Sequence, residues 1–227
     1  RSGDLYAAVR CGDVGIYGRG CHAHNDLLAF ELSCGATPLV VDPGSYLYTA
    51  DPAERNRFRS TAVHSTLQID HAEQNELRED RLFAMVDRAH ATVLSWEVGP
   101  IATTLRGRHH GFEALPVPVT HTRTLRLQRD RSTLEIIDEV LSDGSHELSW
   151  RFPLAPCEVK VVSDAVVARY RDVTVHLRGE GLNLGVEHSW LSPSYGVRIP
   201  TLTVLLRGRS QPGEHRSVIV LAVQREP

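Results

Sequence analysis

A dense group of titratable side chains lies early in the chain, in the stretch GRGCHAHNDLLAFEL at residues 18–32. His22, His24 and Asp26 follow one another at every second position. Alternate residues of an extended chain share one face, so these side chains would point the same way as the apolar run that begins at Leu28. Polar groups are costly to bury without partners. The pattern therefore predicts a pocket, a bound partner or a β-bulge at this point.

Two further positions could join these residues in one site. Asp42 follows the apolar run LVV and precedes Pro-Gly, so a carboxylate lies at a tight turn after a buried strand. His64 lies in STAVHST, just before another apolar strand. With His24, they offer two imidazoles and a carboxylate at three strand ends, which suits a zinc site whose fourth position is open to water or substrate. The alternative is a hydrogen-bonded aspartate in a turn beside two satisfied histidines.

The arginine-rich segment RNRFRST has two interpretations. Arg55, Arg57 and Arg59 alternate with other residues, as they would in a solvated loop that binds nothing. The same guanidinium groups could instead hold a carboxylate-bearing ligand, because arginine binds carboxylates through two parallel hydrogen bonds. The residues alone leave both interpretations open.

Apolar and polar residues alternate at period two through most of the chain, which is typical of antiparallel strands with one wet face. Many short strands pack best as two layers, so we expect an all-β fold, an antiparallel multi-stranded β-sandwich. One short helix is expected at residues 50–58, with Asp51 as its N-cap and Pro52 at its first position. The expected strands are at residues 27–35, 38–44, 65–70, 81–98 (as one strand or a hairpin), 120–128, 132–141, 146–154, 158–162, 165–172, 173–179, 182–190, 201–208 and 217–223.

The composition excludes several classes of function. The 227 residues carry a formal net charge of −3, which gives no basic field for nucleic acid. No apolar stretch approaches the roughly 18 residues of a membrane span. The four cysteines form no close pair, so free thiols are expected, although one disulfide is possible. The opening RSGDLYAAVR is typical of the middle of a protein, so we expect a fragment.

Several of these motifs, taken in order, resemble a known family. GCHAHNDLLAFEL, PLVVDPGSYLYT, RFRSTAVHSTLQID and the later LSWRFPL resemble the C-terminal domain of heparinase II/III-like polysaccharide lyases, including lyases of the oligoalginate type. The resemblance is dense over residues 15–75 and thinner to about residue 155. The ordered set His-x-His-x-Asp, then Asp-Pro-Gly, then His-Ser-Thr carries most of it.

The resemblance implies that this chain is one of two domains of a larger protein. Members of the family pair an N-terminal (α/α) toroid with a C-terminal β-sandwich, and they cleave uronic-acid-containing polysaccharides by β-elimination. We therefore expect residues 1–227 to form a single β-sandwich domain, with the toroid outside this chain. The expected partners are an acidic polysaccharide and that toroid, with no nucleic acid and no membrane span. A bacterial protein, periplasmic or secreted, fits the family best.

The resemblance also implies roles for individual residues. His24, Asp42 and His64 would bind zinc, which orients the strand ends and His22 and is not expected to act directly as a Lewis acid. His22 would face the substrate cleft as the catalytic residue of this domain, neutralising the uronate carboxylate or moving a proton. The expected substrate-binding residues are Tyr46, Tyr48, Arg55 and Arg59.

The chain departs from the family pattern in two respects. The acid/base tyrosine and an Asn-His pair belong to the toroid in family members, and neither Tyr46 nor Tyr48 is expected to replace that tyrosine. Ser65 stands where many members have Asn, so the hydrogen bond made at this position is open.

Two alternatives differ in kind from a lyase domain. A non-catalytic carbohydrate-binding or assembly module would keep the fold and the metal without chemistry, because fold alone does not decide function. A metal-dependent hydrolase or cupin-like enzyme would need a complete ligand set and a carboxylate base, for which Asp26 is the nearby candidate.

Overall fold

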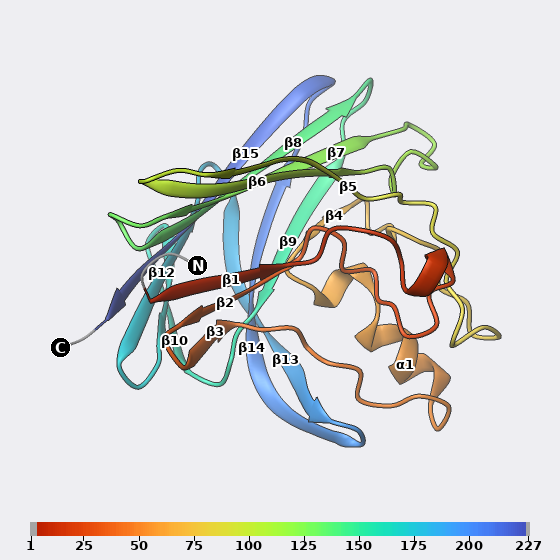
Figure 1. The fold of residues 1–227 in the computed structure, drawn as a ribbon, viewed down its shortest axis with the longest axis horizontal. Coiled ribbons are helices and arrows are strands. Elements are labelled where there is room, and N and C mark those ends of the chain that lie inside the picture. Colours follow the sequence, from red (N-terminus) through yellow and green to blue (C-terminus); the bar gives the residue numbers. More distant parts are fainter. Residues whose placement is uncertain (1–3, 226–227) are drawn as a thin grey trace.

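Alternating apolar and polar residues build three antiparallel sheets in the computed structural model, which describes residues 4–225 (Figure 1). The largest sheet has eight strands, in the order β10 (Glu158–Val162), β11 (Ala165–Arg169), β12 (Val173–Gly179), β15 (Gly213–Arg225), β8 (Thr133–Ser142), β7 (Thr120–Gln128), β6 (Ala102–His109) and β5 (Thr92–Val98). A four-stranded sheet has the order β13 (Asn183–Ser194), β14 (Val197–Arg209), β9 (Glu147–Pro153) and β4 (Leu67–Ile69). The third sheet consists of β1 (Leu5–Val9), β2 (Phe30–Cys34) and β3 (Thr37–Val40).

One hydrophobic core joins the three sheets. Each sheet contributes side chains to this core. The large sheet contributes Leu125 of β7 and Ile136 of β8, the four-stranded sheet contributes Trp150 and Phe152 of β9, and the small sheet contributes Phe30 of β2. All of these side chains are at most 4% exposed. Buried residues alternate with less buried ones most clearly along β6, and the antiparallel sheets share one core, so the prediction of an antiparallel sandwich is confirmed.

The short helix forms as predicted. Helix α1 spans Pro52–Phe58, and the Asp51 carboxylate caps it by accepting a hydrogen bond of 3.0 Å from the Glu54 backbone N–H. Two short 3-10 turns, η1 (Ile16–Gly18) and η2 (Thr61–Val63), complete the regular structure.

The structure differs from the sequence expectation in two stretches. Residues 22–29 are turns and loop, and the strand that follows begins at Phe30 because Leu28 has a φ of 60°. The expected strand at 81–98 is shorter, since β5 begins at Thr92. Met85 and Ala89, upstream of it, pack in a small satellite core with Val14 and Leu27. Strands β1 and β6 were not among those predicted.

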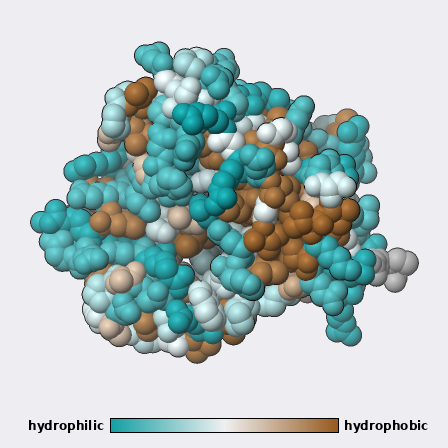
Figure 2. Space-filling model, turned by 180° about the vertical axis from the view of Figure 1, so that it is seen from behind, coloured by the Kyte–Doolittle hydropathy of each residue, from teal (hydrophilic) through white to brown (hydrophobic). Residues whose placement is uncertain are grey.

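The polar first third of the chain gathers at one end of the sandwich. In Figure 1 the loops around η1, helix α1 and the segment before β4 lie on the right, and both labelled chain ends lie toward the left. Figure 2 shows the opposite face, where hydrophilic side chains dominate and hydrophobic ones gather in one broad patch. No helix within residues 4–225 is long and apolar enough to cross a membrane, and all four cysteines are free.

Candidate metal centre and adjoining cleft

Three separate segments converge at this end of the sandwich. His24 lies in the loop before β2, Asp42 lies just beyond the end of β3, and His64 follows η2. Gly44, with a φ of 79°, makes the Asp-Pro-Gly turn possible, because a Cβ there would overlap the Ser192 carbonyl. The Asp42 carboxylate accepts the Gly44 N–H at 2.8 Å, so the turn fixes its direction.

The ligand-type atoms of His24, Asp42 and His64 all lie within 4.8 Å of one another, one atom from each residue. The Nδ1 atom of His64 lies 2.9 Å from Oδ2 of Asp42, and the two imidazole centroids are 5.2 Å apart. Zinc bonds of about 2.1 Å hold tetrahedral ligand atoms about 3.4 Å apart. A small inward adjustment of these side chains would therefore close a shell around one cation.

The electrostatics of His24 and Asp42 suit a cation, whereas those of His64 favour a proton that a metal ion would displace. Burial lowers the pKa of His24 to about 3, with a further contribution from His64, so His24 is neutral at physiological pH, as a metal ligand must be. Burial opposes ionisation of Asp42, but His64 outweighs it and lowers the pKa of that carboxyl to about 2. Burial likewise works against protonation of His64, but Asp42 prevails and raises its pKa.

His64 also carries an unused polar atom. Its side chain is fully enclosed, and its Nε2 atom has no hydrogen-bond partner within the described part of the chain. A buried nitrogen without a partner costs about 1–3 kcal/mol, so such an atom calls for a further partner, such as an ion or a water molecule. The donor set and this orphaned atom both fit a divalent metal ion.

A buried amide network holds the loop that carries His24. Asn25 is 0% exposed and donates to the Glu73 carboxylate at 2.7 Å and to the Asn75 carbonyl at 2.8 Å. Glu73 also accepts hydrogen bonds from the N–H and hydroxyl of Thr61, at the start of η2. One carboxylate thus links the His24 loop to the turn that precedes His64.

Ser65 settles the hydrogen bond that the sequence left open. Its hydroxyl donates to the Phe30 carbonyl and lies 2.9 Å from the Phe30 N–H, which donates to it. These two hydrogen bonds hold Phe30, the first residue of β2, against Ser65, which follows His64 in the chain.

His22 lies in an aromatic cluster. Its ring lies 5.5 Å from Tyr48 and 5.5 Å from Phe83, both edge to face, and Tyr195 stacks on Tyr48 at 5.3 Å. His22 itself is exposed. A solvent-facing imidazole on an aromatic wall beside a metal group is suited to contact a bound sugar.

Arg55 contacts both the aromatic cluster and His24. Its guanidinium carbon lies 5.1 Å from the Tyr48 ring, and its Nη1 lies 3.4 Å from Nε2 of His24. The side chain is 0% exposed, and its Nε and Nη2 have no acceptor among residues 4–225. Burial lowers its pKa. A buried cation with two free donors is poised for an anionic ligand.

The other predicted substrate residues are less directly placed. Arg59 is buried and donates to Asn56 and to the carbonyls of Leu82 and Arg81, so its contacts are all internal. Tyr46 lies against Phe58, with the two ring centroids 5.3 Å apart. Of the predicted substrate residues, Tyr48 contacts His22, and Arg55 lies over the Tyr48 ring.

A cavity of about 600 Å³ opens beside the metal group. His22, His24, Asp26 and Asp42 line one part of it, and residues of β1 and β2 line the rest. Burial raises the pKa of Asp26, against the influence of His64 and Arg10. The space could hold a sugar unit in contact with both His22 and the metal ligands.

Sequence reasoning missed several contributors to this site. Glu73 and Asn75 are ordinary polar residues in a loop, and only the tertiary contacts with Asn25 give them a role. Phe83 lies in a stretch expected to be a strand, and Tyr195 lies in the β13–β14 turn. The expected strands at 182–190 and 201–208 leave a turn between them, but they do not predict the contact of Tyr195 with Tyr48.

Comparison with known proteins adds a family likeness. A family model described as "Heparinase II/III-like, C-terminal" matches residues 1–220. No curated protein matches the chain.

Solved structures with the same fold include several heparinases. A "Heparinase III-BT4657 gene product" is 19% identical with a TM-score of 0.80, over 97% of this chain and 33% of that one. The heparan sulfate lyase HepC from Pedobacter heparinus is 18% identical with a TM-score of 0.81, over 97% and 33%. A further "Heparinase III" is 14% identical with a TM-score of 0.80, over 98% and 34%. The chain therefore spans about a third of the length of these structures.

Proposed function

Because this chain belongs to the heparinase II/III-like family and matches its C-terminal domain, we propose that it is the β-sandwich domain of a polysaccharide lyase. Its substrate is a polysaccharide that contains uronic acid, and the reaction is β-elimination. The domain contributes a zinc site formed by His24, Asp42 and His64, together with His22 in the cleft. The convergence of those three ligand atoms within 4.8 Å, beside an exposed histidine, is the observation that carries the proposal.

The chemistry of elimination matches the charges at the site. Removal of the weakly acidic C5 proton of a uronate builds negative charge on its carboxylate, and the bond from C4 to the leaving oxygen then breaks. A catalyst must stabilise that charge in the transition state. Arg55 offers two free guanidinium donors for the carboxylate, and His22 offers an imidazole on the same side. Tyr48 supplies a flat surface against which a sugar ring can pack.

The metal group acts mainly by holding the protein in shape. A zinc ion at His24, Asp42 and His64 would supply a fixed positive charge and a rigid link between three loops. His24 is two residues from His22, so the direction of His22 depends on the anchoring of that loop. Arg55 lies against His24 and is positioned by the same anchoring.

The base that removes the proton is proposed to come from another part of the protein. Tyr46 packs on Phe58, whereas the ring of Tyr48 contacts His22. The chain spans about a third of the heparinase structures, which leaves room for a helical toroid that completes the active site. Arg59 is assigned to hold residues 81–82 beneath the cleft, and not to bind substrate.

The proposal is tested by comparing residues 1–227 with the full-length protein. Both are incubated with alginate, heparan sulfate and other uronate polymers, and the ultraviolet absorbance of the unsaturated product is followed. The full-length protein should be active on one class of polymer, and residues 1–227 should bind zinc with little or no turnover. Robust turnover by residues 1–227 would refute the shared active site. A full-length protein that binds the polymers without cleaving any of them would favour the carbohydrate-binding alternative.

A further inference from the structure

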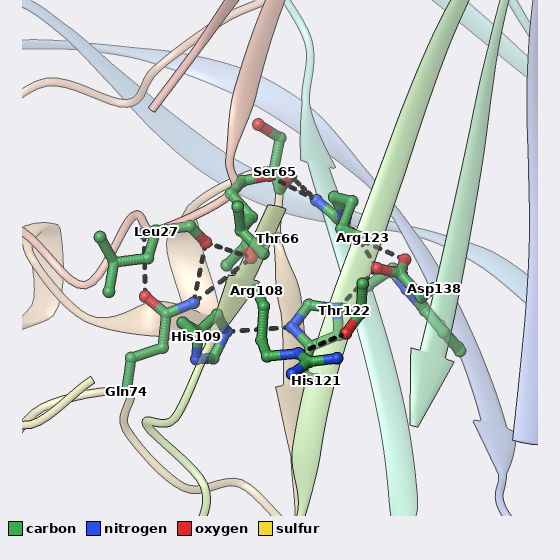
Figure 3. A network of polar contacts seen from close by, with 12 residues as sticks. Leu27, Ser65, Thr66, Gln74, Arg108, His109, His121, Thr122, Arg123 and Asp138 are labelled. Carbon is green, nitrogen blue, oxygen red and sulfur yellow. Dashed lines mark hydrogen bonds and ion pairs between the residues drawn. The ribbon is translucent and has the colours of Figure 1, made fainter. Parts of the chain in front are cut away.

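Arg123 is a fully buried arginine that reaches the metal-centre loops from the opposite sheet. It lies on β7 and is only 1% exposed (Figure 3). Its Nη1 atom donates two hydrogen bonds, of 2.9 Å to the Leu28 carbonyl and 2.7 Å to the Ser65 carbonyl. Leu28 follows the His24 loop, and Ser65 is the neighbour of His64. One nitrogen thus joins the two segments that carry the histidine ligands.

Asp138 fixes the direction of that guanidinium. It lies opposite Arg123 in the β7–β8 register, and its two oxygens accept the Nε and Nη2 donors at 2.8 and 2.9 Å. The same carboxylate accepts hydrogen bonds from Nε2 of His121 at 2.6 Å and from Nε1 of Trp150 at 2.8 Å. A paired and fully bonded carboxylate of this kind is rigid. Arg123 therefore has one orientation, which aims Nη1 at the two carbonyls.

The two clamped segments are also bonded to each other nearby. The Leu27 carbonyl accepts the Thr66 hydroxyl at 2.8 Å and the Gln74 amide at 3.0 Å. Leu28 has a φ of 60°, a conformation that an L-residue adopts only when its surroundings hold it there. Figure 3 shows Ser65 and Thr66 together between Arg123 and Leu27.

We propose that Arg123, held by Asp138, is a positioning residue that sets the distance between His24 and His64 and thereby the affinity of the metal centre. This inference rests on the metal site of the proposed function. The guanidinium is planar and presents its donors in fixed directions, so it can serve the carboxylate and both carbonyls at once. Lysine keeps the charge, but its single ammonium cannot reach both ends of this arrangement.

The test is a titration of the metal-free protein with Co²⁺ and Zn²⁺ in competition with a chromophoric chelator, for wild type and Arg123→Lys. The expected result is a rise in Kd of about tenfold or more, as for loss of other outer-shell partners. The visible spectrum of the Co²⁺-saturated variant should also differ from wild type, because the ligands are held at a changed angle. A general loss of stability would not change that spectrum.

Leu127→Ala is the matched control. It removes core volume from the same strand, β7, but its side chain makes none of the hydrogen bonds of Arg123 or Asp138. The control should lose unfolding free energy, measured in urea, while its metal Kd stays within about twofold of wild type. A parallel weakening of metal binding in both variants would overturn the proposal, as would an unchanged Kd and spectrum in Arg123→Lys.

Asp138→Asn provides a second route if Arg123→Lys does not fold. It loosens the guanidinium without removing it, so a smaller rise in metal Kd is expected, again with Leu127→Ala unaffected. An Asp138→Asn protein with wild-type Kd and spectrum would overturn the positioning role. Failure of wild type to bind either metal would instead contradict the metal centre itself, so the two failures are distinguishable.

Discussion

The Nδ1 atom of His64 lies 2.9 Å from Oδ2 of Asp42, although the two residues come from different loops. The second nitrogen of His64 has no partner among the described residues, and His24 lies alongside with its imidazole centroid 5.2 Å away. A buried nitrogen without a hydrogen bond calls for a further partner, and a bound ion is one. This relationship is therefore the basis of the predictions about metal binding.

Removal of the metal should destabilise the wild-type domain and not the His24→Ala variant. A ligand that binds only the folded state at a hundredfold excess over its Kd adds about 2.7 kcal/mol to the free energy of unfolding. Thermal melts with and without a chelator measure this difference. Wild type should lose several degrees of Tm on chelation, whereas His24→Ala should start lower and not respond.

His188→Ala serves as the control for that experiment, because His188 is an exposed histidine that is not one of the three clustered ligands. It should respond to the chelator as wild type does. An identical chelator response in His24→Ala would mean that His24 is not a ligand.

His22→Ala should separate catalysis from metal binding. His22 contacts Tyr48 and Phe83 but is not one of the three clustered metal ligands. The variant of the full-length protein should keep its zinc and lose activity by about a hundredfold or more, since one general acid/base group contributes about 10²–10⁴-fold. Initial rates of unsaturated product and elemental analysis measure the two properties. Loss of zinc together with activity would place His22 among the ligands.

Arg55→Met should weaken ligand binding without lowering the stability of the domain. Arg55 is buried with two unused donors, and an unsatisfied buried donor costs about 1–3 kcal/mol. The free energy of unfolding should therefore stay equal or rise. The affinity of the full-length protein for a uronate oligosaccharide should fall about tenfold or more, as expected when a charged hydrogen bond is lost. Urea unfolding and calorimetric titration measure these effects.

Arg57→Met is the matched control on the same helix. Arg57 is two residues further along α1 and pairs with Glu54 through two bonds of 2.8 Å. Its substitution should leave oligosaccharide affinity unchanged. Equal losses of affinity in the two variants would contradict a specific role for Arg55.

The stability of the domain should fall as the pH drops below about 6.5, the ordinary pKa of histidine. His109 accepts the Gly111 N–H on Nδ1, and its Nε2 lies 2.9 Å from Nδ1 of His121, whose Nε2 faces Asp138. This chain of bonds needs both imidazoles neutral. Burial lowers the pKa of His109 well below its ordinary value and also lowers that of His121.

The sign of the effect follows from proton uptake. The unfolded chain binds protons at these histidines below about pH 6.5 and the folded chain does not, so acid favours unfolding by up to about 1.4 kcal/mol per pH unit for each histidine. Above that pH the contribution is constant. Urea unfolding at several pH values, with chelator present, should give a shallower dependence for His109→Gln than for wild type. Equal slopes would contradict the assignment.

Local signals explain what the sequence predicted correctly. Asp51 and Pro52 specify the start of α1 by capping and by a fixed φ, which need no distant contact. Asp42 is placed by its own Pro-Gly turn. The strand pattern predicted most of the sheets because burial on one face imposes alternation.

Contacts between distant segments explain what the sequence could not predict. The alternation of His22, His24 and Asp26 suggested a strand, but Leu28 takes a positive φ and its carbonyl turns to Arg123, which lies 95 residues away. The sequence predicts no site residue beyond Ser65. Asp138 nevertheless aims Arg123 at the site loops, a role that only the β7–β8 register specifies.

The central claim is that His24, Asp42 and His64 bind one divalent cation. Its most direct test is the metal content of the purified protein after exhaustive dialysis, measured beside the Asp42→Ala variant. The account predicts about one zinc ion per wild-type chain and a much lower content in the variant. Wild-type protein with no more zinc than Asp42→Ala, and no uptake when zinc is added, would contradict it.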